Sequence, residues 1–337
     1  MSEFRHAFEL VEQAVISGLV PGAALGVVRR GQSPVIQVWG LAQREPVTRP
    51  LERGHFFDLA SLTKVLFTVP GLLRLVEAGE ADLQDPLSRH LPEAAWLQGS
   101  ELPGRTLWQL LTHTAGLPAW EALYSWSRDP DLLRQRLLQH RWPLGESVYS
   151  DLGYMLLGLV LERQNGPLIN QALPPGFTWT PAAEASVATQ HCPWRGAVMC
   201  GRPDDENADA LQGAGHAGLF ATVDGVVGLL AGWLSGEGLS GAVLNTLRRP
   251  TTPTRALGWE RAHPQFSGGS LCSPETLGHT GFTGTGAWID YGSGVAWTLL
   301  TNAVHPSRPR RPDLLALRQA VGNAVVSGLP LSSGLQS

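Results

Sequence analysis

A serine and a lysine three residues apart are the first pair in this sequence that could carry out chemistry. Ser61 precedes an apolar run that predicts a helix over residues 62–78, and residues three apart share a helix face, so Lys64 can lie beside the Ser61 hydroxyl. A serine hydroxyl is a weak nucleophile that needs a nearby base. A lysine amine can serve if burial lowers its pKa. An isolated Ser-x-x-Lys is also compatible with Ser61 as a helix N-cap and Lys64 as a surface residue.

Lys64 is also the single lysine of the chain. The chain has 25 lysines and arginines in total, and all of them except Lys64 are arginines. This sequence therefore uses arginine as its surface cation throughout. Arginine cannot give up its proton near neutral pH, whereas a buried lysine can. The exception at position 64 therefore indicates a position that needs a titratable amine.

Two further motifs could complete a catalytic site. Tyr149 and Asp151 lie in a loop before a predicted helix, where a phenol could move a proton to a leaving group or could simply pack. Residues 277–284 form a small-residue strand or turn that contains His279, and its glycines allow close approach of a substrate backbone. Each motif is weak evidence by itself.

Together, these motifs resemble the penicillin-recognising serine hydrolases, the group of class C β-lactamases, D-alanyl-D-alanine carboxypeptidases and esterases. The resemblance rests on the order and spacing of Ser-x-x-Lys near 60, Tyr-x-Asp near 150 and His-Thr-Gly near 280, and on residues 110–117 and 213–220. It implies that Ser61 attacks a carbonyl and is acylated, and that Lys64 and Tyr149 share the base and acid roles. His279 would help to hold the Tyr149 phenol and a substrate carboxylate.

The same resemblance implies the substrate contacts. The backbone N–H groups of Ser61 and Phe282 would form the oxyanion hole, with Thr280 and Gly281 of the third motif beside the substrate. Asp151 stands where β-lactamases usually have an asparagine that contacts the acyl side-chain amide, and an anionic residue there fits esterase and peptidase relatives better. The resemblance implies neither a metal ion nor an organic cofactor.

A further segment, residues 204–208, resembles a branch that includes exo-acting N-acetylmuramoyl-L-alanine amidases, which remove the peptide from N-acetylmuramic acid. Members of that branch carry a histidine where this chain has an aspartate at the first of these positions. The resemblance makes Asp205, Asn207 and His216 candidates for lining the cleft. Turn formation by Asn and Asp, and a backbone contact by the histidine, are the structural alternatives.

The secondary structure that must position these motifs follows from the hydrophobic pattern. Helical periodicity predicts a helix over residues 3–18, and apolar runs predict strands at 23–30 and 34–40. Near the other end, the pattern predicts strands at 286–290 and 295–302 and a closing helix at 314–326. The middle contains helical patches at residues 107–111, 132–138, 155–161 and 223–234.

Strands at both ends and helices between them predict an α+β fold. We expect a β-lactamase-like antiparallel sheet flanked by the terminal helices, with a large, mostly helical insertion. The sheet domain would comprise residues 1–82 and 250–337, and the insertion residues 83–249. The site would lie in the groove between them, with Ser61 at its base.

Composition and charge exclude several other classes. The formal net charge of −4 does not favour nucleic acid or an anionic membrane as a partner, and the basic run 308–311 is interpreted as a solvated loop. No uninterrupted apolar run approaches the eighteen residues of a membrane span, and the N-terminus contains acidic residues that argue against a signal peptide. Three cysteines fit a reducing compartment. The expected location is cytoplasmic.

Other classes of protein would require motifs that differ from those found here. An α/β-hydrolase needs Gly-x-Ser-x-Gly and a zinc hydrolase His-Glu-x-x-His, and neither occurs. A non-catalytic family member that binds peptides or forms assemblies usually lacks the serine, lysine or tyrosine, all of which are present here. The sequence therefore predicts a serine hydrolase that forms an acyl-enzyme with a small amide or ester. A muropeptide or D-amino-acid peptide is the favoured substrate, with a carboxylic ester or a β-lactam as alternatives.

Overall fold

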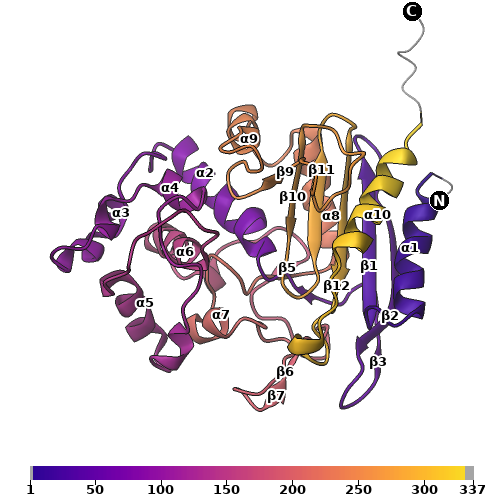
Figure 1. Cartoon of the computed structure of the whole chain (residues 1–337), viewed down its shortest axis with the longest axis horizontal. Coiled ribbons are helices and arrows are strands. Elements are labelled where there is room, and N and C mark those ends of the chain that lie inside the picture. The colour runs from indigo at the N-terminus through magenta and orange to yellow at the C-terminus, as the bar shows by residue number, and fades with distance from the viewer. Residues whose placement is uncertain (1–2, 331–337) are drawn as a thin grey trace, which may run out of the picture.

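The computed structural model describes residues 3–330 and is built around one seven-stranded antiparallel sheet (Figure 1). The strand order is β3-β2-β1-β12-β11-β10-β9. In the middle of the sheet, β1 from the N-terminal part of the chain therefore pairs with β12 from the C-terminal part. The strands are β1 (Gly22–Arg29), β2 (Val35–Gln43), β3 (Arg49–Pro50), β9 (Glu260–Arg261), β10 (Thr276–Thr280), β11 (Gly286–Asp290) and β12 (Val295–Thr301). In the central pair, Ala23 of β1 lies opposite Thr301 of β12.

Helices cover both faces of this sheet. The terminal helices α1 (Arg5–Ile16) and α10 (Leu315–Ser327) pack against each other on one face, and α8 (Val223–Ser235) packs on the other (Figure 1). Every residue of β12 is buried, because both faces of this strand are covered. The expected α+β fold with flanking terminal helices is confirmed. Helix α8 belongs to the sequence range of the expected insertion, yet it packs on the sheet.

The chain between β3 and β9 is mainly helical. Its helices are η1 (Lys64–Thr68), α2 (Val69–Glu77), α3 (Leu87–His90), η2 (Pro92–Trp96), η3 (Leu102–Gly104), α4 (Leu107–Leu111), η4 (Leu123–Ser125), α5 (Pro130–Gln139), α6 (Asp151–Asn165), η5 (Leu168–Asn170), α7 (Glu206–Leu211), α8 and α9 (Gly241–Arg248). A 3₁₀ turn, η6 (Arg308–Arg310), precedes α10. Across residues 3–330, every helix is too short or too polar to span a lipid bilayer.

Short strand pairs tie this region together. Strands β4 (Phe57–Asp58), β8 (Phe220–Ala221) and β5 (Phe177–Thr178) form a three-stranded sheet, in that order. Strands β6 (His191–Cys192) and β7 (Ala197–Val198) form a separate hairpin. The strand β4 leads directly into the Ser61 turn, so this small sheet fixes where that turn begins.

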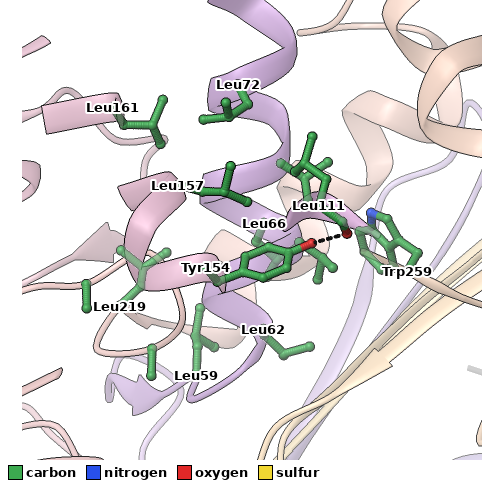
Figure 2. Packing of buried hydrophobic residues seen from close by; sticks show 14 of the residues in the cluster. Leu59, Leu62, Leu66, Leu72, Leu111, Tyr154, Leu157, Leu161, Leu219 and Trp259 are labelled. Carbon is green, nitrogen blue, oxygen red and sulfur yellow. Dashed lines mark hydrogen bonds between the residues drawn. The ribbon is translucent and has the colours of Figure 1, made fainter. Parts of the chain in front are cut away.

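Apolar packing holds the helix that follows Ser61. Figure 2 shows Leu66 and Leu72 of this helix packed with Leu157 of α6 in the buried core. In the same cluster, the Tyr154 hydroxyl donates a hydrogen bond to the Leu111 carbonyl oxygen over 2.9 Å. A buried hydroxyl needs such a partner, so this bond fixes α6 against the end of α4.

The sheet is attached to the Ser61 turn by the connection between β10 and β11. The Thr283 hydroxyl donates to the Asp58 carbonyl oxygen over 2.7 Å, and the Thr285 hydroxyl donates to the Leu59 carbonyl oxygen over 3.1 Å. Gly281 lies so close to this contact that a Cβ there would be 2.6 Å from the Leu59 oxygen. The two halves of the site are therefore positioned by direct contact between backbone segments.

This close approach predicts that Gly281→Ala displaces the Ser61 turn. The new Cβ would collide with Thr285 Oγ1 and with the Leu59 carbonyl oxygen, so one segment must move. We expect a destabilisation of about 1–3 kcal/mol and a loss of kcat/KM larger than that destabilisation explains. Chemical unfolding and ester hydrolysis measure the two effects. The matched control is Gly54→Ala, whose Cβ would have no atom within 4 Å; equal activity in both variants would contradict this account.

Candidate active site

A strained turn presents Ser61. Ala60, immediately before it, has a φ of 45°, in the left-handed region that residues other than glycine rarely occupy. The Asp58 carboxylate accepts a hydrogen bond from the Ala60 N–H over 2.8 Å and holds this conformation. The turn places Ser61 three residues before η1, a π-helical segment of the kind that is frequent at functional sites.

Lys64 lies in the first turn after Ser61 and is completely buried. Its Nζ is 3.0 Å from Ser61 Oγ, 3.0 Å from the His216 carbonyl oxygen and 2.7 Å from Asp151 Oδ1. An ammonium group has three N–H donors and no acceptor. Two hydrogen bonds to oxygen acceptors and an ion pair with Asp151 favour the protonated form of Lys64.

The charges around Lys64 support the same protonation state. Burial by itself would lower the pKa of the Lys64 amine, but the charge of Asp151 and the oxygen of Tyr149 outweigh burial and raise that pKa above its ordinary value. This direction favours the ammonium form in the structure without substrate, whereas the sequence led us to expect that burial would favour the neutral amine; the role of Lys64 as a base stays a prediction. The anionic side chain of the second motif is the cause of the raised pKa.

Tyr149 is held by a stack of rings. Its ring centroid lies 4.3 Å from that of His113, which lies 5.0 Å from that of Tyr154. His113 Nδ1 accepts a hydrogen bond from the Ser150 N–H over 3.0 Å. Burial, followed by the charges of Lys64 and Arg255, lowers the pKa of His113 to about 3, so this histidine is neutral and its role is to position Tyr149.

His279 on β10 completes the group around Tyr149, at a ring distance of 6.1 Å. Its Nδ1 lies 2.9 Å from the Thr280 carbonyl oxygen, which fixes the proton on that nitrogen and leaves Nε2 as an acceptor. Burial, followed by the charges of Lys64 and Arg255, lowers the pKa of His279 well below its ordinary value. These features favour a neutral His279 in the structure without substrate, and its implied role in holding the Tyr149 phenol and a substrate carboxylate stays a prediction.

A pocket of about 410 Å³ opens in front of Ser61. Six residues of the predicted site line it, namely Ser61, Tyr149, His279, Thr280, Gly281 and Phe282. Asp151 joins this group through its contact with Lys64. The remaining lining residues, which the sequence analysis did not identify, are Arg255, Glu260, Gln265, Ser267, Arg311, Leu315 and Arg318.

The basic run 308–311 reaches the rim of this pocket through Arg311, while Pro309 and Arg310 are exposed, so the run is only in part the solvated loop that was expected. The guanidinium carbons of Arg308 and Arg311 lie 5.3 Å and 4.8 Å from the centroid of the Phe282 ring. Arg308 also contacts Asp204 Oδ2 at 3.0 Å. The run is therefore held against the active site by a cation–π contact and an ion pair.

Asp205, Asn207 and His216 lie outside the residues that line this pocket. His216 is buried, with its Nε2 3.0 Å from Asp205 Oδ1, and it reaches the site only through its carbonyl oxygen, which accepts from Lys64. Burial opposes ionisation of Asp205, but the contact with His216 outweighs burial and lowers the pKa of Asp205 to about 2. Asn207 is buried and bonds to backbone groups. These three residues therefore hold neighbouring backbone and Lys64 in position and do not face the pocket.

Across residues 3–330, no group of three or more His, Cys, Asp or Glu side chains is arranged to hold a metal ion. The three cysteines are free thiols. The contact between Ser61 and Lys64, with Tyr149 in the same pocket, is an arrangement that can support nucleophilic attack by Ser61 with proton transfer through Tyr149.

Comparison with known proteins agrees with this chemistry. The model of the Beta-lactamase family matches residues 8–321, and the chain belongs to this family as a serine hydrolase. An N-acetylmuramyl-L-alanine amidase of Bacillus subtilis (strain 168) is 29% identical over 90% of this chain and 81% of its own. A protein of Escherichia coli (strain K12) named "Putative D-alanyl-D-alanine carboxypeptidase" is 28% identical over 85% of this chain and 79% of its own.

Solved structures share the fold at lower identity. EstCE1, a hydrolase with promiscuous acyltransferase activity, superposes with a TM-score of 0.76 at 21% identity, over 96% of this chain and 98% of its own. A class C β-lactamase gives the same TM-score at 18% identity, over 98% of this chain and 97% of its own. The arrangement of sheet and helical region is therefore that of the class C β-lactamases and related esterases.

The position of Tyr149 predicts that Tyr149→Phe retains the fold but slows acylation. The variant keeps the ring that stacks on His113 and loses only the phenol oxygen. We expect acylation to slow by about a hundredfold or more, the usual contribution of general acid–base catalysis, with little change in Tm. Single-turnover kinetics with a chromogenic ester measures the rate. A slowing of less than about threefold would remove the phenol from the mechanism.

The ion pair predicts the effect of Asp151→Asn on pH dependence. Removing the negative charge should lower the pKa of Lys64, because burial then acts with less opposition. If the ammonium is the working form, activity is lost as the pH rises through that pKa, and this loss should begin at a lower pH in the variant. Profiles of kcat/KM over neutral and alkaline pH provide the measurement. Activity that instead rises through this range would identify Lys64 as a free base.

Proposed function

We propose that the protein hydrolyses an amide or ester whose leaving part carries a negative charge, through an acyl-enzyme on Ser61. The observation that carries this proposal is a group of three arginines, Arg255, Arg311 and Arg318, in the same pocket as Ser61. Within residues 3–330, none of the three forms an ion pair with a carboxylate of the chain. A substrate anion would supply the missing charge.

Arg318 on α10 gives the strongest support. Its side chain is buried, and one terminal nitrogen donates to the Thr285 carbonyl oxygen over 3.0 Å, while its Nε has no partner among the described residues. Burial, followed by the charge of Arg311, lowers the pKa of Arg318 to about 10. A buried cation that remains charged beside a second cation is stabilised when an anion enters the pocket.

The acidic residue that lines the pocket, Glu260, forms no ion pair with these arginines, although its charge favours the charged form of Arg318. Glu260 uses one carboxylate oxygen at 2.8 Å from His263 Nε2 and accepts from the Ser267 hydroxyl, also at 2.8 Å, with the other. Arg255 instead lies over the Tyr149 ring, with its guanidinium carbon 5.4 Å from the centroid. The positive charge of the pocket is thus available next to the residue that transfers the proton.

The proposed mechanism uses Tyr149 as a proton relay. As Ser61 Oγ attacks the carbonyl carbon, its proton moves to the Tyr149 oxygen, and the tyrosine's own proton moves to the leaving nitrogen or oxygen as that bond breaks. Within the described residues, the backbone N–H groups of Ser61 and Phe282 donate to no protein acceptor and are available to the oxyanion. Water then attacks the acyl-enzyme, and the same relay returns the proton to Ser61.

A D-amino-acid peptide or a muropeptide is the substrate class that we propose. Such peptides carry free carboxylates, which suit the arginines of the pocket. The names of the Escherichia coli and Bacillus subtilis relatives support a wall-derived peptide. The three free thiols support a cytoplasmic location, where such a peptide would be an imported or recycled fragment.

The experiment that tests this proposal is mass spectrometry of a muropeptide mixture incubated with the protein, with Ser61→Ala as the control. Release of the whole peptide from the sugar would support an amidase, and release of a terminal D-alanine a carboxypeptidase. If short esters are cleaved while the muropeptides remain intact, the proposal of a peptide substrate fails.

The arginine group predicts a specific loss in Arg255→Gln. We expect the ratio of kcat/KM for a peptide with a free terminal carboxylate to that for its amidated form to fall about tenfold or more, as a charge-assisted contact is lost. Arg5→Gln on the exposed face of α1 is the matched control and should keep the wild-type ratio. An unchanged ratio in Arg255→Gln would show that this arginine does not bind the carboxylate.

A further inference from the structure

Two exposed tryptophans and a half-buried tyrosine form an aromatic surface that the proposed mechanism does not use. Trp120 and Trp194 are 46% and 64% exposed, and Tyr124 lies between them, with ring centroids 6.3 Å and 5.3 Å away. We call these three residues the aromatic ledge. Contiguous exposed apolar side chains of this size mark binding sites more often than ordinary surface does.

The ledge is joined to the catalytic motif by hydrogen bonds. The Ser150 hydroxyl donates to the Pro118 carbonyl oxygen over 2.7 Å, and the Asp151 N–H donates to the Ala119 carbonyl oxygen over 2.8 Å. Trp120 is the next residue along the chain. Asp151 also contacts Lys64, so the segment that carries Trp120 lies next to the Asp151 side of the active site.

Asn207 fixes the other end of the same loop. Its side-chain oxygen accepts from the Tyr124 N–H over 3.0 Å, and its side-chain nitrogen donates to the Glu121 carbonyl oxygen over 2.8 Å. Asn207 is buried and lies on α7. This residue, expected from sequence to line the cleft, instead holds the loop that carries Trp120 and Tyr124.

The hairpin that carries Trp194 is held by contacts between Arg195 and residues 203–209, just before and within α7. The guanidinium of Arg195, whose side chain is buried, donates to the Pro203 and Asp204 carbonyl oxygens, each over 2.7 Å, and lies 3.2 Å from Asp209. Because this arginine points inward, it is not part of the exposed surface. Residues 119–126 and 191–197 contain no other lysine or arginine, so the ledge offers aromatic faces without a fixed cation.

We propose that the aromatic ledge binds the pyranose ring of a sugar-linked peptide substrate. The C–H face of a pyranose packs on an aromatic ring while its hydroxyl groups stay in water, which suits the two exposed tryptophans beside the half-buried Tyr124. A stable protein partner engages about 20–30 residues a side, far more than three rings. The inference rests on the proposed function, because it places the sugar on the ledge and the anionic peptide on the pocket arginines.

The test compares two ligands that differ only in their N-terminal acyl group, N-acetylmuramoyl-L-alanyl-D-isoglutamine and N-acetyl-L-alanyl-D-isoglutamine, of which only the first carries the sugar. Calorimetry with Ser61→Ala protein measures both Kd values without turnover. We expect the sugar-linked ligand to bind about tenfold more tightly or better, and Trp120→Ala or Trp194→Ala, each added to that background, to remove most of this preference. The matched control is Trp96→Ala, which removes a tryptophan that is 69% exposed on η2.

Two results would overturn the inference: equal Kd values for the two ligands, or a preference that survives both ledge substitutions. Turnover of the same ligands by the wild-type protein separates this inference from the proposed function. A sugar preference that depends on the ledge, without cleavage of either ligand, would support the ledge and contradict the proposed amide hydrolysis. Cleavage without any preference for the sugar would contradict the ledge alone.

Discussion

The buried contact between the Lys64 ammonium and the Asp151 carboxylate is the interaction on which the rest of this site depends. A lysine without exposed surface needs a nearby negative charge to remain protonated, because burial by itself favours the neutral amine. Asp151 supplies that charge at 2.7 Å, and the same ammonium lies 3.0 Å from the Ser61 hydroxyl. In the proposed mechanism, Lys64 is thereby a fixed positive charge beside the nucleophile, and Tyr149 transfers the proton.

The fold positions this contact from both of its regions. Asp151 begins α6, which is packed against the helix after Ser61 and tied to α4 through Tyr154. The sheet reaches the same point through the hydroxyls of Thr283 and Thr285, which hold the turn before Ser61. The geometry of the site thus depends on contacts between segments more than two hundred residues apart in the chain.

The sequence predicted the parts of this structure that local patterns determine. The sheet strands at both ends, the terminal helices and the positions of Ser61, Lys64 and Tyr149 follow from periodicity and motif spacing. The protonation state of Lys64 did not follow, because it depends on how two buried charges balance in three dimensions. Arg255 and Arg318 were missed for a related reason: nothing local distinguishes them from the other arginines of the chain, and only folding brings them to one pocket.

The most direct test of this account is the pKa of Lys64. Because Lys64 is the single lysine, protein labelled with ¹³C-lysine gives one Cε resonance whose chemical shift follows the protonation of this amine. The account predicts that this resonance keeps its ammonium shift beyond pH 10.5, the ordinary pKa of a lysine side chain. A titration midpoint near neutral pH would show instead that burial dominates and that Lys64 is a neutral base in the free enzyme.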